Sequence, residues 1–468
     1  SRYINVFLAD SNIYTKQKVY SAFSSAQLGF RNYAYLNLTA RNDWSSTLPA
    51  ANRSYFYPSV NASFILTEAF DIKSDVLNFA KIRGGWSKVG KDATPYQLLN
   101  TYNFTAPFDG NPQQGINAIE LNPNLKPETT NSTEAGVELG FFKNRLRLDL
   151  GVYNTNSIDQ ILNLDVSPTT GFSSKLVNGG TINNKGIEAI LGLTPVKTDH
   201  FSWDIDLNYS LNRSKVKALY ENVQSFVLGT DGTVQVLATI GQPYGTLFGT
   251  AYERNAAGDI LVEADGTPAI SASKKILGKY TPDWMGGINN TFRYKDISLS
   301  VLVDAHIGGK IFSGTNSTGT YTGVLASTLP GRGAENGGLT YTAADGSSRD
   351  DGMIFQGKLA DGTPNSTIIP AEQYYKAITN ADEAFVYSAN FVKLREVKLS
   401  YKLPSNWIQS IGLQSATVSL VGRNLLVIHK NVPNIDPETA FNTGNGQGLE
   451  DLTLPTVRNI GFNLNFKF

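Results

Sequence analysis

Apolar and polar side chains alternate with a period of two residues along almost the whole chain, and this pattern limits the fold more than any other feature. In FSWDIDLNYSLN (201–212) every odd-numbered residue is apolar and every even-numbered residue is polar. Successive side chains of a β-strand point to opposite faces, so such a segment predicts a strand with one apolar and one polar face. On this basis we assign about fourteen strands, at residues 1–9, 17–30, 31–43, 59–70, 77–88, 132–142, 145–157, 183–194, 201–212, 285–294, 297–307, 389–402, 414–424 and 457–468.

Many of these strands are 10 to 12 residues long. Ordinary globular strands average ~5–6 residues, whereas a tilted strand that crosses a bilayer needs ~9–11. The expected fold is therefore an all-β, transmembrane, antiparallel up-and-down β-barrel.

The connections between the strands alternate between short and long. In a bacterial outer-membrane barrel the short turns face the periplasm and the long loops face the outside, and a soluble sandwich or propeller has no reason to sort its loops in this way. We therefore expect 213–284 and 308–388 outside the cell, and 293–296 and 403–412 in the periplasm. The short connections are 29–32, 71–75, 141–145, 194–200, 293–296 and 403–412, and the long ones are 44–58, 89–131, 158–182, 213–284, 308–388 and 425–456.

Charged residues on the polar faces are expected to point into the lumen, because an Arg or Lys that faces lipid at mid-bilayer costs ~2–4 kcal/mol. The favoured interpretation is a solvated or mutually paired interior; the alternative is that these charges also hydrate passing solutes or grip a plug. The strand 389–402 is an exception, because Lys393 and Arg395 share the parity of Val397 and Leu399. If that face meets lipid, both bases must lie at the level of the outer headgroups. The lumen-facing set comprises Glu134, Glu138, Arg147, Asp149, Asp204 and Asp206.

Composition excludes several other functions. The 40 Lys and Arg balance the 40 Asp and Glu, which argues against nucleic acid as a partner, and the absence of Cys excludes disulfides and thiol chemistry. No uncharged apolar run approaches the ~20 residues of a transmembrane helix. The three histidines are scattered, and no hydrolase or P-loop motif is present. We predict no enzyme activity, no cofactor and no metal; the loop carboxylates Glu253, Asp259, Glu263 and Asp265 are interpreted as solvated charges.

The long loops carry two further signals. DG pairs recur in GTDGT, EADGTPA, AADGSSRDDG and LADGTPN, and they predict turns, since none completes a calcium-loop motif. Apolar side chains among these turns predict ordered loops, packed on each other or on a partner. They are Tyr244, Leu247, Phe248, Tyr252, Ile260, Tyr341, Ile354, Phe355, Tyr374 and Tyr375.

The chain ends on NIGFNLNFKF (459–468), an alternating strand with no polar tail. We expect this strand to close the barrel against the first strand, because an unpaired end would fray. Its apolar residues should face lipid, and the pattern resembles the C-terminal insertion signal of bacterial outer-membrane proteins. The signal residues are Phe462, Leu464, Phe466 and Phe468.

Several segments resemble the SusC/RagA family of TonB-dependent outer-membrane transporters of Bacteroidetes, in family order and over nearly the whole chain. The clearest is ARNDWSSTLPAANRSYFYPSVNASFILTEAF (40–70). Others are KIRGGWSKVGKDATPYQL (81–98), LNPNLKPETTNSTEAGVELGFFKNRLRLDLGVYN (121–154), NGGTINNKGIEAILGL (178–193), KYTPDWMGGINNTFRYKDISLSVLVDAHIGGKIF (279–312), ANFVKLREVKLSYKLP (389–404) and VSLVGRNLLVI (418–428).

This resemblance implies a plugged barrel of about 22 strands that is capped by a SusD-like lipoprotein and imports oligosaccharides or peptides with energy from TonB. Residues 1–468 would be the C-terminal barrel portion, about 14 strands, with the plug, the TonB-contacting segment and the first strands before Ser1. Two alternatives are a barrel that acts as a scaffold or assembly component, and a secreted β-protein that binds or cuts glycans.

The hallmark stretch RNDWSS offers two candidates for substrate contact, Asp43 and Trp44. A sugar could stack on the Trp44 ring while Asp43 binds it. The favoured interpretation is structural: a strand-end cap with an interface tryptophan. RSYFYP (53–58) is likewise interpreted as a packing cluster.

Overall fold

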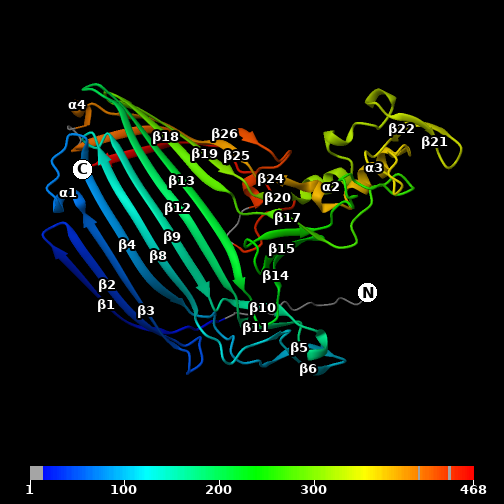
Figure 1. The fold of residues 1–468 in the computed structure, drawn as a ribbon, viewed down its shortest axis with the longest axis horizontal. Coiled ribbons are helices and arrows are strands. Elements are labelled where there is room, and N and C mark those ends of the chain that lie inside the picture. The colour runs from blue at the N-terminus through cyan, green and yellow to red at the C-terminus, as the bar shows by residue number, and fades with distance from the viewer. Residues whose placement is uncertain (1–13, 409–411, 441–443) are drawn as a thin grey trace.

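The computed structural model describes residues 14–408, 412–440 and 444–468. Its main feature is a 13-stranded antiparallel sheet in which each strand pairs with its neighbours along the chain (Figure 1). Thirteen of the predicted strands are present in it; the strand expected at 1–9 lies outside the described residues. The strands are β1 Val19–Phe30, β2 Ala34–Ser45, β3 Ser54–Ile65, β4 Leu77–Lys91, β8 Glu128–Phe141, β9 Leu146–Ile158, β12 Thr181–Lys197, β13 Phe201–Ala218, β18 Trp284–Tyr294, β19 Ile297–Ile307, β25 Phe391–Lys402, β26 Ser415–Lys430 and β28 Asn459–Lys467.

The strand expected at 59–70 is displaced. β3 begins at Ser54 and ends at Ile65, and α1 (Leu66–Ala69) follows it directly. LTEA is made of residues that are acceptable or good helix formers, so one helical turn competes successfully with a further stretch of strand. The aromatic segment 54–57 therefore belongs to β3. The sequence-based prediction of a long connection over 44–58 is wrong for these residues.

Short turns join the strands at one end of the sheet, and long connections leave the other end (Figure 1). The short turns contain non-glycine residues at positive φ, such as Arg31 (46°) and Asn32 (61°) between β1 and β2. Turns with positive φ match the right-handed twist of the strands they join. The predicted alternation of short and long connections is confirmed except around β3, where the connection before the strand (46–53) is shorter than the connection after it (66–76).

The register confirms the predicted faces. Leu207 of β13 lies opposite Leu191 of β12 and Ile288 of β18, all three on the apolar side. The next residue of β13, Asn208, points to the polar side. β28 pairs with β26 along one edge; within the described residues its other edge has no partner strand, so closure of the barrel by β28 stays a prediction.

One prediction about faces is wrong. Opposite β19, residue Leu302 pairs with Glu396 and Val303 pairs with Leu394, so Arg395 is an extra residue in β25. This β-bulge reverses the parity of the strand. Lys393 and Arg395 therefore point into the lumen, while Val397 and Leu399 keep the lipid side, and neither of these two bases has to lie at the level of the headgroups.

The long connections form small sheets and helices of their own, which supports the predicted order of the loops. Buried clusters lie within them, around Leu247 with Tyr280 and around Tyr252 with Phe355. None of the helices among the described residues is long and apolar enough to span a membrane. The loop elements are β5 Tyr102–Phe108, β6 Asn111–Ile116, β7 Ile119–Glu120, β10 Ile161–Asp165, β11 Ser174–Asn178, β14 Ser225–Asp231, β15 Val234–Thr239, β16 Thr246–Gly249, β17 Lys275–Lys279, β20 Lys310–Ser313, α2 Gly314–Tyr321, β21 Leu339–Thr342, β22 Ser348–Met353, β23 Ile369–Pro370, α3 Ala371–Ile378, β24 Val386–Ser388 and β27 Leu449–Glu450; α4 (Ser405–Ile408) lies in a short connection.

Candidate functional site

The lumen side of the large sheet carries a ladder of cross-strand ion pairs. Arg83 of β4 donates to Glu138 of β8 at 3.0 Å and to Asp149 of β9 at 2.6 Å. Lys81 also donates to Glu138, at 2.9 Å. The charges of the wall thus neutralise one another across neighbouring strands, because opposite charges on facing positions attract.

The ladder continues over the next strands. Arg147 of β9 lies 3.5 Å from Asp206 of β13, and Arg293 of β18 pairs with Asp204. Glu134 has no cation within ion-pair distance among the described residues and accepts a hydrogen bond from Ser132. Of the two interpretations left open by the sequence, mutual pairing accounts for most of these charges.

A second group of charges fastens a loop to the wall. Lys393 is 1 % exposed and donates to Asp436 at 2.6 Å and to Glu438 at 2.5 Å. Arg395 donates to Glu438 at 2.6 Å and to Asp304 of β19 at 2.6 Å. We call these five residues the lumen latch; it exists because the bulge in β25 turns both bases inward, toward acids of the connection 431–458.

The two loop carboxylates of the latch are held ionised. Burial raises the pKa of Asp436, but hydrogen bonds from Lys393 and Thr456 outweigh it and keep the pKa below its ordinary value. Burial likewise raises the pKa of Glu438, and hydrogen bonds from Arg395 and Lys393 lower it further than burial raises it. Buried charges of this kind persist only when paired and hydrogen-bonded, and here both conditions are met.

Three long connections are clasped together above the lumen. Asp382 accepts hydrogen bonds from Thr233 Oγ1 at 2.6 Å and from the Thr250 amide at 2.7 Å, which joins 308–390 to 219–283. Glu450 is fully buried and accepts from Ser313 at 2.8 Å and Thr315 at 2.6 Å, which joins 431–458 to β20 and α2. We call this assembly the loop layer, and its order comes from packing of loop against loop.

A cavity of about 550 Å³ lies between the lumen wall and the loop layer. Its polar lining comes from β12, β13, β19 and β25 together with the latch loop, and it has the size of a site for a small organic ligand. Most of the lining is apolar, and hydrogen-bonding and charged side chains stand at separate points within it. The polar residues are Glu188, Asn208, Ser210, Asp304, His306, Arg395 and Glu438.

The two substrate candidates of the hallmark stretch lie on opposite faces of β2. Asp43 points into the lumen, is 5 % exposed, and accepts from Arg41 at 2.8 Å and from Tyr57 at 2.5 Å. Trp44 points to the lipid side and is 39 % exposed. The structure does not bring them together, so a combined contact with one sugar has no geometric support. In 53–58, Tyr55 and Tyr57 stack on the lumen side at 5.9 Å.

The remaining sequence-based assignments concern turns, metals and the last strand. The DG segments form turns. In one of them Asp265 accepts a hydrogen bond from the Thr267 amide, and Gly266 between these residues has a φ of 85°. Within the described ranges no group of His, Asp and Glu could hold a metal ion. Phe462, Leu464, Phe466 and Phe468 are exposed on the lipid side of β28 and beyond its end; their role in insertion stays a prediction.

Sequence reasoning missed the lumen latch. The signal was present as two bases at apparently lipid-facing positions of 389–402, together with the acids of NIDPETA (434–440). A charged residue at a position that the alternation assigns to the lipid face is itself a sign of a β-bulge, because one extra residue moves the charged side chain to the lumen face.

Comparisons with known proteins agree with this geometry. The profile of the family described as "TonB dependent receptor-like, beta-barrel" matches residues 2–425. Curated relatives include TonB-dependent receptors P3 and P26 of Formosa agariphila, at 25 % and 29 % identity, which cover 99 % and 96 % of this chain and 47 % and 46 % of those proteins. TonB-dependent receptor SusC of Bacteroides thetaiotaomicron is 23 % identical over 64 % of this chain and 32 % of its own length.

Among solved structures, that of the RagAB peptide transporter superposes with a TM-score of 0.72 at 20 % identity, covering 97 % of this chain and 48 % of the matched chain. This likeness shows the fold. The chain spans about half the length of the curated relatives P3 and P26.

Proposed function

Because this chain belongs to the TonB-dependent receptor-like β-barrel family and lies in the outer membrane, we propose that it is part of an active importer of SusC/RagA type that takes up oligosaccharides or peptides. Energy comes from TonB, and a SusD-like surface lipoprotein caps the barrel. Residues 1–468 form the C-terminal barrel portion of such a transporter. The protein has no catalytic role.

The observation that carries this proposal is the charge-neutralised lumen wall beneath an ordered loop layer. The cation–carboxylate pairs of the wall, such as Arg83 with Glu138 and Asp149, offer hydrogen bonds to a solute without an excess of one charge that would trap it. The cavity of about 550 Å³ under the loop layer gives such a solute a place to reside.

A partner on the outer rim is supported by exposed apolar side chains around α2. Tyr321, Val324 and Leu329 are all exposed, although the loop layer around them is well packed. Exposed apolar side chains that gather on an ordered surface mark interaction sites. Order of the loops alone does not require a partner, since loop packs against loop, and so the SusD-like partner rests on this surface and on the relatives.

The partner is tested by purification in mild detergent through a tag on the complete protein. We expect a SusD-like lipoprotein to co-purify, and Val324→Asp with Leu329→Asp to release it while the barrel stays folded. Val76→Asp is the matched control, since Val76 is exposed in a short connection at the opposite end of the sheet. A chain that purifies alone while the neighbouring lipoprotein is expressed contradicts the capped importer.

Import is tested with panels of fluorescent oligosaccharides and fluorescent peptides given to cells with and without the complete gene. Uptake of one panel that depends on both the gene and TonB supports the proposal and identifies the substrate class. If cells without the gene lose a surface complex but take up both panels as well as cells with the gene, the scaffold alternative is favoured.

A further inference from the structure

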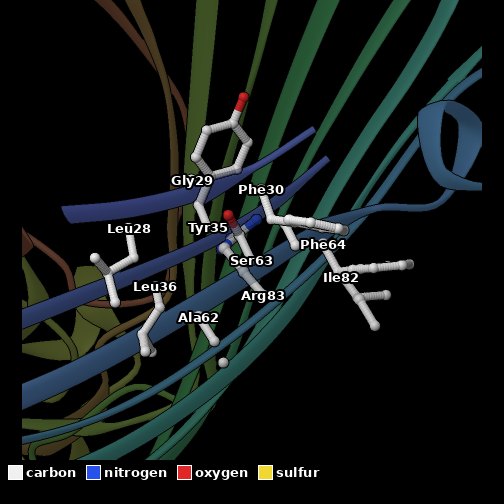
Figure 2. Close-up of a pocket in the computed structure, with 12 residues that line it drawn as sticks. Leu28, Gly29, Phe30, Tyr35, Leu36, Ala62, Ser63, Phe64, Ile82 and Arg83 are labelled. Atoms are coloured by element: carbon white, nitrogen blue, oxygen red, sulfur yellow. The ribbon is translucent and has the colours of Figure 1, made fainter. Parts of the chain in front are cut away.

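An apolar hollow of about 520 Å³ opens on the lipid side of β1 to β4, close to the short turns (Figure 2). Two neighbouring rows of cross-strand partners form it. One row runs Leu28, Leu36, Ala62, Gly84, and the other runs Phe30, Ala34, Phe64, Ile82. Tyr35 and Arg83, which also border it, have the opposite parity and point to the lumen side.

The hollow exists because large and small side chains are unevenly placed in these rows. Ala62 and Gly84 form a low floor on β3 and β4, whereas Leu28, Phe30 and Ile82 stand up around it and are exposed. A convex barrel surface has no such depression where neighbouring residues are of equal size. In an outer-membrane protein this face meets acyl chains, so the hollow is open to a lipid chain.

The end of the hollow nearest the turn carries an aromatic cluster and a positive charge. Phe30, Tyr33 and Phe64 pack edge to face, with ring centroids 5.6 and 5.4 Å apart. Aromatic rings of this kind mark the level of the headgroups. Arg31 lies at the turn with its guanidinium 5.3 Å from the Phe30 ring centre, and no carboxylate among the described residues lies within ion-pair distance of it.

We propose that this hollow is a specific site for an anionic glycerophospholipid of the inner leaflet of the outer membrane. One acyl chain lies over Ala62 and Gly84, and the phosphate lies against Arg31. The short-turn end of the sheet faces the periplasm, where glycerophospholipids form the leaflet, so the hollow and the charge are at the correct depth. This inference rests on the membrane location and not on what the transporter carries.

The site is tested on the complete protein, equilibrated with vesicles of phosphatidylethanolamine and phosphatidylglycerol and then examined by native mass spectrometry. The wild type should retain one phosphatidylglycerol per chain. Ala62→Phe fills the hollow and should retain it ~10-fold less, as expected when about two methylene groups lose their contact. Gly84→Val is a second filling variant, since its Cβ would meet only the Glu134 carbonyl oxygen at an ordinary 3.6 Å.

Two controls make the test specific. Ala189→Phe makes the same change on the lipid side of β12, outside the rows of the hollow, and should retain lipid like the wild type. Arg31→Gln should reduce retention roughly fivefold and remove the preference over phosphatidylethanolamine, whereas Arg145→Gln, in the short turn between β8 and β9, should not. Heat-modifiable migration on gels verifies folding of each variant.

Equal retention by Ala62→Phe, Gly84→Val and Ala189→Phe overturns the proposed site. Retention of phosphatidylethanolamine and phosphatidylglycerol to the same extent, unchanged by Arg31→Gln, overturns the assignment of an anionic lipid.

Discussion

The ammonium group of Lys393 lies 2.6 Å from Oδ1 of Asp436, and both side chains are buried. Lys393 belongs to a strand of the wall, whereas Asp436 belongs to the connection 431–458. The pair therefore fixes a long loop against the lumen side of the barrel. Loss of one partner leaves the other as an uncompensated buried charge, and this strongly destabilises the folded protein.

Lys393→Met should destabilise the folded barrel by about 3–5 kcal/mol and expose 431–440 to protease. Lys398→Met is the matched control, because Lys398 lies on the same strand and has no ion pair among the described residues. Heat-modifiable migration at increasing temperature and limited proteolysis measure the two effects. The double variant Lys393→Met, Asp436→Asn should recover part of the loss, and no recovery would contradict a pairwise role.

Acid should open the lumen latch. The pKa values of Asp436 and Glu438 lie below their ordinary values of 3.8 and 4.5 in the folded protein. A carboxylate whose pKa is lower in the folded than in the unfolded protein stabilises the fold at pH values above its ordinary pKa. This stabilisation is lost as the pH falls through the pKa of the folded state. Protease protection of 431–440 should therefore persist down to about pH 4 and disappear below it. In Asp436→Asn the acid-dependent loss should be smaller; protection that fades between pH 5 and 8 would contradict this assignment.

The two rims should label differently on intact cells. Cys in place of Thr230 or Ser347 should react with an impermeant reagent, because both residues are exposed in long connections. Thr230 lies close to the turn at Gly232, where a φ of 55° disfavours any side chain and so excludes Gly232 itself as a labelling site. Asp296→Cys lies in a short turn and should label only after the outer membrane is opened. The reverse pattern would invert the topology and move the proposed lipid site to the other leaflet.

Neighbouring residues of β13 should differ sharply in their tolerance of a charge. Leu207→Arg places a base on the lipid side and should cost ~2–4 kcal/mol. Asn208→Arg places it in the lumen, opposite Gly287, and should fold as the wild type does. The fraction of heat-modifiable barrel recovered from each variant measures the difference, and equal losses would refute the assigned faces.

The sequence by itself determined the fold class, the strand order and most of the faces, because strand periodicity and loop length are local properties. The alternation in 201–212 places Leu207 toward lipid and Asn208 toward the lumen without reference to any other part of the chain, and the register agrees. The alternation of short and long connections likewise required only counting.

Only the tertiary structure decided which charges are paired and at which residue the alternation of strand faces is interrupted. The bulge at Arg395 becomes visible only when β25 is aligned with β19, because one unpaired residue shifts every side chain that follows it to the other face. The partners of Lys393 come from a connection 43 and 45 residues away, and the hollow over Ala62 and Gly84 comes from rows that cross four strands. Contacts between segments far apart in the chain are set by register and packing, and periodicity within one segment contains no information about them.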